Sequence, residues 1–268
     1  GVVMTSFSVS TVAGVPLGLF LAAHWSWHMP FFAIAAVVAV LWLLIWQTFP
    51  VLDAHVHHHQ GRSAWAGIAQ VLADGGHLRA FALTGTMMLA GFLVIPYITI
   101  YLQSNSGMRA DQVPWVYLCG GVATLLTGRW IGQLSDRLGK ARMFRRMAWL
   151  LPVPLMATTL SEGLPLWALL LISTSLFTVM SGRMIPGMAL ISSAAQPRLR
   201  GTFMSLNSAV QSAAMGVAAL VGGLIIGRDA QGHLTHYWVA GLLGSLLSLA
   251  TLWLVSRVRV HGAATPPR

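Results

Sequence analysis

Eight stretches of the chain are long and apolar enough to cross a lipid bilayer as α-helices. A spanning helix needs roughly 20 predominantly apolar residues, whereas the strands of a membrane β-barrel alternate in hydrophobicity over pieces of about 10 residues. Because these stretches are continuous, we predict an all-α membrane protein with eight transmembrane helices. Their expected bounds are Val2–Ala23, Met29–Phe49, Ala80–Gln103, Val113–Leu134, Arg146–Leu160, Pro165–Ala195, Thr202–Gly227 and Tyr237–Ser256.

The composition supports a membrane protein and excludes several other classes. Only 8% of the residues are charged and 56% are hydrophobic, whereas a typical soluble domain is about 25% charged. A soluble globular enzyme and a disordered chain are therefore excluded. The net charge of +10 does not indicate nucleic-acid binding, because the Lys and Arg residues are too sparse. The single cysteine, Cys119, excludes a disulfide scaffold.

The positive charges fall on alternate loops between the predicted helices. Twelve of the sixteen Lys and Arg residues lie in the loops 50–79, 135–146 and 196–201 and in the C-terminal tail. The opposite loops carry Arg109 and Arg228, each close to an aspartate. Since loops rich in Lys and Arg stay in the cytoplasm, we expect both ends of the chain to be cytoplasmic. Five tryptophans fall near helix ends on the outer side, as interfacial anchors do: Trp25, Trp27, Trp115, Trp167 and Trp238.

The start of the sequence is similar to its end. The segments from Met4 to Gly18 and from Met204 to Gly223 each begin with Met and Ser and continue into a glycine-rich middle. Either two Ser- and Gly-rich helices match by composition alone, or the chain contains parts of two related halves, as transporters often do. In the second case, the first two helices correspond to the last two, and four helices of the first half are missing. The chain also begins at Gly1 inside an apolar stretch, so we expect a piece of a longer protein.

A basic motif between the predicted fourth and fifth helices is the most specific signal in the sequence. The run from Gly128 to Arg142 reads GRWIGQLSDRLGKAR. It resembles the cytoplasmic-loop signature of the major facilitator superfamily, in its second copy between helices eight and nine. The matching positions are Gly132, Asp136, Arg137, Gly139, Lys140 and Arg142.

This resemblance implies a major facilitator-type helical bundle, of which the chain holds eight of twelve expected helices. Residues 1–49 are then the last two helices of the N-terminal half, 50–79 the central cytoplasmic loop, 80–257 the C-terminal six-helix half and 258–268 a cytoplasmic tail. The resemblance also implies a multi-pass protein of the bacterial inner membrane without a cofactor. The expected partners are the lipid bilayer, a small-molecule substrate, protons and the missing N-terminal four helices, with no nucleic acid.

Two shorter motifs resemble those of drug and sugar exporters in the same family. Gly14, Pro16 and Gly18 resemble the glycine-proline motif in helix five of the antiporters, although the longer G-x-x-x-G-P-x-x-G-G pattern is incomplete. The run from Arg183 to Ala189 resembles the R-x-x-Q-G-x-x-A block of helix four, here in the pseudo-symmetric helix ten. The resemblance is closest to the bacterial arabinose-efflux and multidrug branch. It implies a secondary active transporter that exports a sugar or a drug-like compound, with the proton gradient as energy source.

The residues of the basic motif have physical roles in alternating access. Gly132 is expected to let neighbouring helices approach closely, and Gly139 to permit a tight turn. Asp136 follows a helix C-terminus, where the helix dipole disfavours a negative charge, so it needs Arg137, Arg129 or another helix N-terminus as partner. A charge pair that breaks in one conformation gates the transporter. The alternative is a fixed turn whose cations only set the topology.

Arg183 is a charge well inside a predicted span. A guanidinium at mid-helix costs about 3 kcal/mol, and no Asp or Glu lies deep in the eight helices. Arg183 is therefore expected to contact polar side chains, backbone carbonyls, a substrate anion or the missing helices, and the resemblance implies a link to proton coupling. The alternative is a position near the cytoplasmic end, where Arg183 reaches water or pairs with Asp136.

Two pairs of polar side chains are candidate substrate contacts. Asn207 and Gln211 share a helix face. They either face a central cavity and bind hydroxyls of the substrate, or form hydrogen bonds between helices. Tyr97 and Tyr101 follow the Pro96 kink and either stack on a ring-shaped substrate or anchor the outer interface.

Other functions remain to be weighed against transport. A membrane-embedded enzyme needs paired Asp, a Ser/His arrangement or a metal motif, and the sequence shows none of these patterns. A sensor, or a truncated product that does not transport, is the remaining alternative. We expect no metal site, because the histidines of the central loop fit a solvated segment better than a metal-binding one: His55, His57, His58 and His59.

Overall fold

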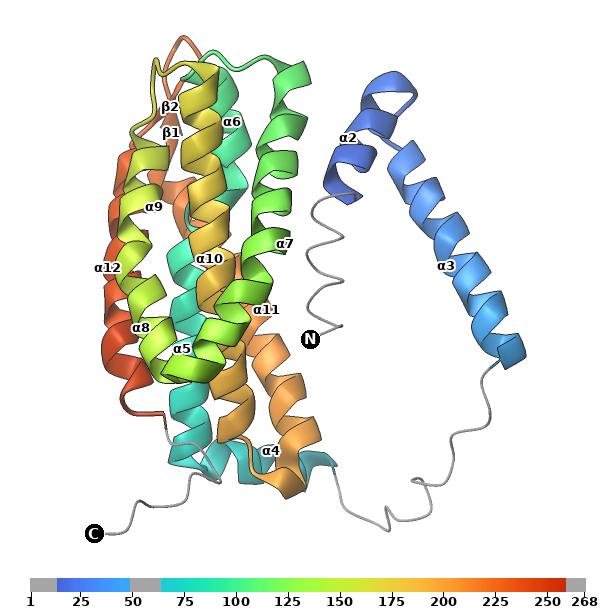
Figure 1. The fold of residues 1–268 in the computed structure, drawn as a ribbon, viewed down its shortest axis with the longest axis vertical. Helices are drawn as coiled ribbons and strands as arrows, with labels where there is room; N and C mark the ends of the chain where they lie inside the picture. The colour runs from blue at the N-terminus through green and yellow to red at the C-terminus, as the bar shows by residue number, and fades with distance from the viewer. Residues whose placement is uncertain (1–13, 49–63, 259–268) are drawn as a thin grey trace.

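The computed structural model describes residues 14–48 and 64–258, and its long elements are helices (Figure 1). The first described part is a hairpin of α2 (Val15–His24) and α3 (Met29–Thr48), and the second begins with the short helix α4 (Ala64–Ala73). The main bundle follows, with α5 (Gly75–Phe92), η3 (Ile95–Tyr97), α6 (Ile98–Ser104), η4 (Ala110–Gln112), α7 (Val113–Leu138), α8 (Lys140–Leu150), α9 (Pro152–Thr159), α10 (Leu166–Ala194), η5 (Pro197–Leu199), α11 (Arg200–Ile225) and α12 (Tyr237–Val255). Two short antiparallel strands, β1 (Gly227–Arg228) and β2 (Leu234–Thr235), join α11 to α12.

Each of the eight predicted segments coincides with helical structure, the first of them from residue 14 onward. α7 has 26 residues but is less apolar than the other long helices, because it carries Arg129 and a polar last turn. The fifth predicted segment is divided between α8 and α9. In the described residues, the helical stretches that are both long and apolar enough to cross a membrane are Met29–Thr48, Gly75–Ser104, Leu166–Ala194, Pro197–Ile225 and Tyr237–Val255. The all-α membrane fold expected from the apolar runs is confirmed.

The bundle helices run side by side, with α5 between α11 and α12. α10 packs most extensively against α7 and also contacts α8 and α9. α2 contacts α7, whereas α3 extends away from the bundle and has no buried residue (Figure 1). α4 lies across one end of the bundle, against α11 and α5. The N-terminal hairpin is therefore attached to the bundle through α2.

The third predicted segment is a broken helix. α5 ends at Phe92, and α6 continues it after an irregular stretch that contains Pro96. Proline has no N–H and its ring clashes with the preceding turn, so carbonyl groups upstream lose their helical partners. Two tyrosine hydroxyls bridge the break: Tyr237 of α12 donates to the carbonyl of Val94 (2.9 Å), and Tyr97 donates to a carbonyl of α11. The break is thus fixed to two neighbouring helices.

The expected loop 135–146 is a turn of a single residue. α7 continues through the first part of this range and α8 begins directly after Gly139, so the basic residues lie on helices. Gly139 has a φ of 91°, which favours glycine. Lys and Arg are good helix formers, and Met143 and Phe144 bury one face of α8. For these reasons the helix begins well before Arg146, the start expected from hydropathy.

The expected central loop 50–79 contains helix in its described part. α4 packs on α11, and α5 begins ahead of the boundary expected from hydropathy. Asp74 sets this start, because its carboxylate accepts hydrogen bonds from the Gly76 N–H (2.7 Å) and from the Gln196 side chain (2.7 Å). The hydrogen bond from Gly76 holds the pKa of Asp74 below its ordinary value of 3.8. Asp74 therefore stays charged at the N-terminus of α5, where the helix dipole favours an anion.

Two clusters of buried apolar side chains fill the bundle. One contains Leu155 and Tyr237, and the other contains Phe144. Glycines bring the helices around these clusters into close contact. A Cβ atom added to Gly244 of α12 would lie 2.5 Å from the carbonyl oxygen of Ala90 in α5. Since a backbone carbonyl in a helix has little room to move, α5 and α12 need glycine at this position.

Exposed tryptophans lie near both membrane interfaces expected for the bundle. The five expected outer anchors are exposed near helix ends. A second set lies on α7, α8 and α12, in the half of the bundle that contains the basic turn at Gly139. A bundle that crosses a membrane needs such aromatic residues at both interfaces. The sequence interpretation did not identify the members of this second set, which are Trp130, Trp149 and Trp253.

We expect the substitution Gly244→Ala to destabilise the protein by about 1–3 kcal/mol, because the added methyl group overpacks the contact with Ala90. The matched control is Gly216→Ala in α11, where an added Cβ meets no atom within 4 Å. The control should leave stability unchanged or raise it slightly, since alanine favours helix. Thermal unfolding of both purified variants in detergent measures this difference, and equal midpoints would contradict the packing argument.

Candidate functional site

A layer of buried polar side chains crosses the interior of the bundle. It consists of Thr84 on α5, Arg183 on α10, Asn207 on α11 and Ser248 on α12, and we call it the central polar layer. Arg183 and Asn207 are each 1% exposed, and Thr84 and Ser248 are fully buried. Arg183 and Asn207 both reach the same turn of α5, which carries Thr84 and Met87. The layer therefore joins four helices in the interior of the bundle.

Arg183 finds its hydrogen bonds inside the protein. Its Nη2 donates to the Met87 carbonyl (2.8 Å), and its Nη1 lies 3.4 Å from the Ser248 hydroxyl. Ser248 in turn donates to the Ala148 carbonyl of α8 (2.9 Å). Of the expected partners, a backbone carbonyl and a polar side chain are the ones present. The alternative that Arg183 reaches water or pairs with Asp136 is wrong, because the side chain points into the bundle and is almost fully buried.

Asn207 is held between α11 and α5, while its expected partner on the same face lies nearer the surface. The Thr84 hydroxyl donates to the Asn207 Oδ1 over 2.6 Å. Gln211 is half-buried, and Ser208 and Ser212 are exposed. Asn207 thus forms the hydrogen bond between helices that one of the two alternatives expects. Gln211 lies one turn away along α11, toward the exposed face that Ser208 and Ser212 share.

Two donors of the central polar layer have no partner in the part of the chain that the structure describes: Arg183 Nε and Asn207 Nδ2. Buried N–H groups are nearly always hydrogen-bonded, and an unsatisfied one costs about 1–3 kcal/mol. Both atoms are donors, so the group that satisfies them is a hydrogen-bond acceptor such as a carbonyl, a hydroxyl or an anion. The single charge of the layer is positive, which favours an acceptor with negative charge.

The tyrosine pair lies inward. Tyr101 is 4% exposed and packs against Tyr237 with ring centroids 4.6 Å apart. Tyr97 donates to the Ala219 carbonyl (2.5 Å), and a Cβ atom added to Gly222 would lie 2.7 Å from the Tyr97 ring. The expectation that this pair anchors the outer interface is wrong, because the break between α5 and α6 turns both rings toward α11 and α12. Both side chains connect helices.

The two glycines of the basic motif differ in their surroundings. The tight turn expected at Gly139 is confirmed by its positive φ. An added Cβ at Gly132 meets no described atom within 4 Å, so no described helix approaches α7 closely at this residue. The expectation of a close helix contact at Gly132 is therefore wrong within residues 14–48 and 64–258.

The charges of the basic motif are not paired with one another. Asp136 lies in the last turn of α7 and is exposed. Neither Arg137 nor Arg129 forms an ion pair with it, and no hydrogen bond to it is present in the described residues. Lys140 and Arg142 begin α8 and likewise have no carboxylate partner among these residues. Asp136 therefore has no compensating charge among the residues that the structure describes, although its position at a helix C-terminus requires one.

The glycine-proline motif lies at the start of the described chain. Pro16 is in the first turn of α2, where its missing N–H breaks no helical hydrogen bond. Gly14 precedes that helix, and a Cβ at Gly18 would lie 4.0 Å from the Cβ of Pro30, so α2 and α3 approach each other there. Residues 1–13 and the histidine cluster 55–59 lie outside the described residues, so the structure does not test what the sequence predicts for them.

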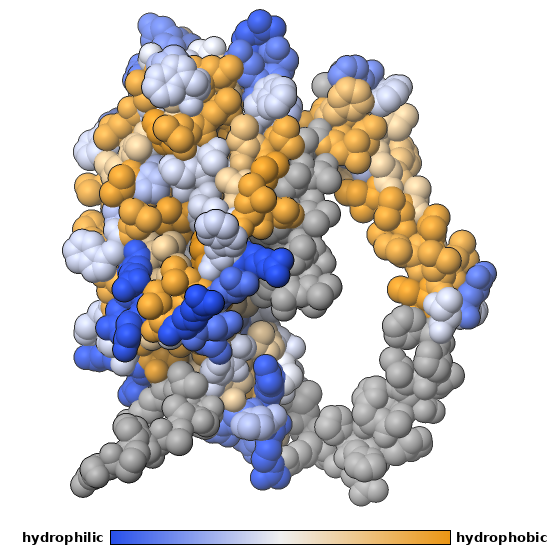
Figure 2. All heavy atoms as spheres, in the orientation of Figure 1, coloured by the Kyte–Doolittle hydropathy of each residue, from blue (hydrophilic) through white to orange (hydrophobic). Residues whose placement is uncertain are grey.

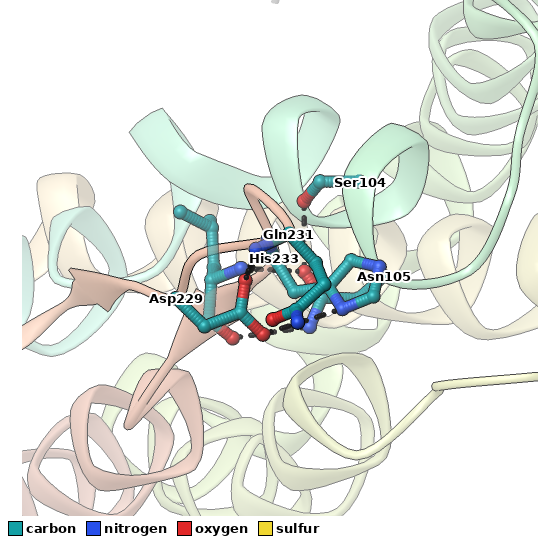
Figure 3. A network of polar contacts seen from close by, with 6 residues as sticks. Ser104, Asn105, Asp229, Gln231 and His233 are labelled. Atoms are coloured by element: carbon teal, nitrogen blue, oxygen red, sulfur yellow. Dashed lines mark hydrogen bonds and ion pairs between the residues drawn. The ribbon is translucent and has the colours of Figure 1, made fainter.

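A second polar network closes the end of the bundle at the hairpin between α11 and α12 (Figure 3). The side chain of Asn105, which follows α6, pairs with the backbone of Leu234 through both its Nδ2 (3.0 Å) and its Oδ1 (2.8 Å). Asp229 accepts hydrogen bonds from the N–H groups of Gln231 (3.0 Å) and His233 (2.7 Å) and lies 3.4 Å from the His233 ring. The hairpin between α11 and α12 is thereby fixed to α6. No pattern in the sequence identified Asn105, because its partner is the backbone of a residue more than a hundred positions away.

The apolar spanning helices, the broken helix and the buried polar layer define a multi-pass α-helical membrane protein. The family model of the Major Facilitator Superfamily matches residues 80–268, so the chain belongs to that superfamily. The chain is 26% identical over 94% of its length to the uncharacterized MFS-type transporter YbcL of Bacillus subtilis, and 23% identical over 94% to the uncharacterized MFS-type transporter YtbD of the same organism. It covers 62% of each of these relatives. The chain thus spans less than two thirds of their length.

A double-mutant cycle tests the contact between Thr84 and Asn207. Thr84→Val leaves the Asn207 Oδ1 without its donor, and Asn207→Leu removes the acceptor. We expect a coupling free energy of about 0.6–1.7 kcal/mol from unfolding of the two single variants and the double variant. Pairing Asn207→Leu with Thr127→Val serves as control, because Thr127 bonds only within α7. Additive effects for the first pair would contradict the contact.

Proposed function

We propose that the complete protein is a secondary active transporter that exports a small molecule, a sugar or a drug-like compound, in exchange for protons by alternating access. One observation carries the proposal. Arg183 is a guanidinium deep in the bundle that is held by the Met87 carbonyl and retains an unpaired Nε. Charged groups inside a membrane are costly and mark pathways for substrates or ions. Membership of the Major Facilitator Superfamily and the similarity to MFS-type transporters support the same function.

In this proposal the central polar layer recognises an acceptor group of the substrate. Arg183 Nε and Asn207 Nδ2 supply the donors, and the Met87 carbonyl holds the guanidinium in place. Gln211 lies toward the exposed side of α11 and contacts the substrate on its way to the layer. A substrate oxygen loses its hydrogen bonds to water when it binds. In the layer these bonds are replaced by hydrogen bonds from two donors that the fold has already positioned.

The turn at Gly139 serves as the gate. Asp136 has no partner in this conformation although it lies at the C-terminus of α7, where a negative charge is disfavoured. An ion pair between Asp136 and a cation would therefore stabilise a second conformation relative to this one. A ligand that prefers one conformation then shifts the equilibrium between the two, which is the basis of alternating access.

The proton carrier lies elsewhere in the proposal. The chain has six acidic residues, of which Asp53 lies outside the described residues. The other five lie at helix ends or between helices, not deep in a span: Asp74, Asp111, Asp136, Glu162 and Asp229. Because the chain spans 62% of its relatives YbcL and YtbD, we place the coupling carboxylate in the part of their length that it does not cover. Residues 1–268 alone are then expected not to transport. A sensor, or a truncated product without transport, is the alternative function.

The substitution Arg183→Met separates a functional role from a structural one. Replacing a buried charge by an apolar side chain of similar size is often neutral or stabilising, so the thermal midpoint should stay unchanged or rise. Transport should fall at least about tenfold, because the donor that recognises the substrate is lost. The measurement is uptake of ethidium, or of labelled arabinose, into energised everted vesicles that contain the full-length protein.

Arg228→Met is the matched control, because Arg228 is exposed on β1 and lies outside both the central polar layer and the basic motif. This variant should transport like the wild type. Full activity of Arg183→Met would refute the role of Arg183. Uptake that persists when a protonophore collapses the gradient would refute proton coupling but leave the transport proposal in place.

We expect Asp136→Asn to reduce flux by about tenfold without changing membrane insertion or the thermal midpoint. The carboxylate is exposed and unpaired here, so its removal costs the observed fold little, whereas the opposite conformation loses a charge pair. The same vesicle assay measures the flux. Asp111→Asn, in an exposed outer pair with Arg109, is the control and should remain active. A gating role for Asp136 is ruled out by unchanged flux in the full-length protein.

A further inference from the structure

Three arginines and a tryptophan form one stripe on α8. Arg142, Arg145, Arg146 and Trp149 are spaced i, i+3, i+4 and i+7, which places them on one face of the helix. All four are exposed, and we call them the basic stripe. Figure 2 shows strongly hydrophilic residues gathered over α7 and α8 in the lower half of the bundle, among a largely apolar surface. The opposite face of α8 is buried through Met143, Phe144 and Ala148.

The basic stripe begins in the first turn of α8, at Arg142, where a positive charge is least favourable. A helix N-terminus carries about +0.5 of an elementary charge, and the first turn of α8 contains no acidic residue. None of the three arginines pairs with a described carboxylate, and the Arg145 Nε reaches only the Ala141 carbonyl, at 3.3 Å. Arg137 and Lys140 add further positive charge at the same corner. Asp136 of α7 lies at the same corner but forms no ion pair with these cations among the described residues, so a net positive charge remains.

Along the helix, the exposed side chains change from charged to aromatic to aliphatic, which is the order of headgroup, interfacial region and acyl chain in a phospholipid. Three cations come first, then Trp149, which is 65% exposed, and then Val153, which is 67% exposed. α8 and α9 form an almost continuous helix here, because the Leu155 N–H donates to the Leu151 carbonyl across the junction. A charged headgroup, an interfacial region and an acyl chain follow one another in the same sequence. The positive-inside rule explains which side carries the cations but not why they share one face with a tryptophan.

Helix α12, which packs against α8, indicates that the membrane interface lies at the level of the basic stripe. Ser248 of α12 donates to the Ala148 carbonyl, which brings these two residues to one level. Trp253 is five residues further along α12, and at a rise of about 1.5 Å per residue this brings it to the level of the basic stripe. The Arg257 guanidinium covers the Trp253 ring at 3.7 Å. Arginine and tryptophan therefore meet at the same level on two adjacent helices.

We propose that the basic stripe binds an anionic phospholipid of the cytoplasmic leaflet. The phosphate lies between the guanidinium groups of Arg142, Arg145 and Arg146, whose planar donors fit its oxygens. The acyl chain follows Trp149 and Val153 toward the membrane interior. The lipid supplies the negative charge that the N-terminus of α8 lacks.

The test is native mass spectrometry of the full chain in detergent with equal amounts of phosphatidylglycerol and phosphatidylcholine. We expect the wild type to retain phosphatidylglycerol preferentially. The triple variant R142Q/R145Q/R146Q should lose at least about tenfold of this retention, since each cation near an anionic surface contributes to binding. The matched control is R79Q/R198Q/R200Q, which removes the same charge from exposed arginines on α5, η5 and α11 and should retain the lipid.

Further variants keep the test decisive if the triple variant does not fold. R142K/R145K/R146K preserves the charge and should retain phosphatidylglycerol more weakly than the wild type, because the planar donors are lost. Trp149→Ala should weaken retention, whereas Trp130→Ala, at a still more exposed tryptophan on α7, should not. Equal retention of the two lipids by the wild type, or equal losses in the two glutamine triple variants, overturns the proposal. Displacement of the lipid by millimolar glycerol phosphate also overturns it, because the site then recognises a soluble phosphate.

Discussion

A guanidinium inside an apolar bundle must find its hydrogen bonds within the protein, because lipid supplies none. Arg183 meets this constraint by linking α10 to the Met87 carbonyl of α5 and, through Ser248, to α12 and α8. The contacts require short distances between helices, and glycines on both sides of Arg183 provide them. A Cβ at Gly182 would lie 3.0 Å from a methionine sulfur of α8, and one at Gly187 would lie 3.0 Å from the Met87 sulfur. Close packing and the buried charge therefore depend on each other.

The same constraint explains the two other places where the backbone leaves regular structure. At the break around Pro96, the hydroxyls of Tyr237 and Tyr97 donate to carbonyls that connect α5, α11 and α12. At the hairpin between α11 and α12, the Asn105 amide binds the backbone of Leu234 as a neighbouring strand would. At the hairpin a side chain replaces the strand that a sheet would supply, and at the break the two hydroxyls fix the irregular backbone to neighbouring helices. Irregular backbone is tolerated because these partners come from other elements.

Sequence reasoning identified the helices and the buried charge, but not the partners. Long apolar runs predict helices because hydropathy and length are properties of consecutive residues. The Met87 carbonyl was not predictable as the acceptor for Arg183, since every residue carries the same carbonyl and only the fold selects one. The turn at Gly139 was expected, yet the helical conformation of the basic residues after it was not, because their charge suggested a loop. The predicted close helix contact at Gly132 was wrong for the described residues for a related reason. A glycine permits close packing, but only the tertiary structure decides whether another helix lies next to it.

Depth in the membrane decides how the protein treats its two groups of positive charge. In the central polar layer, water is excluded and Arg183 must be satisfied by dipoles of fixed geometry. At the corner of α7 and α8, Asp136 and the arginines are exposed, so water and lipid headgroups screen them and unpaired charges cost little. A conformational change that moved this corner into the bundle would remove the screening. In the gate that we propose, Asp136 would then have to pair with a cation before the corner became buried, which would couple helix movement to charge pairing.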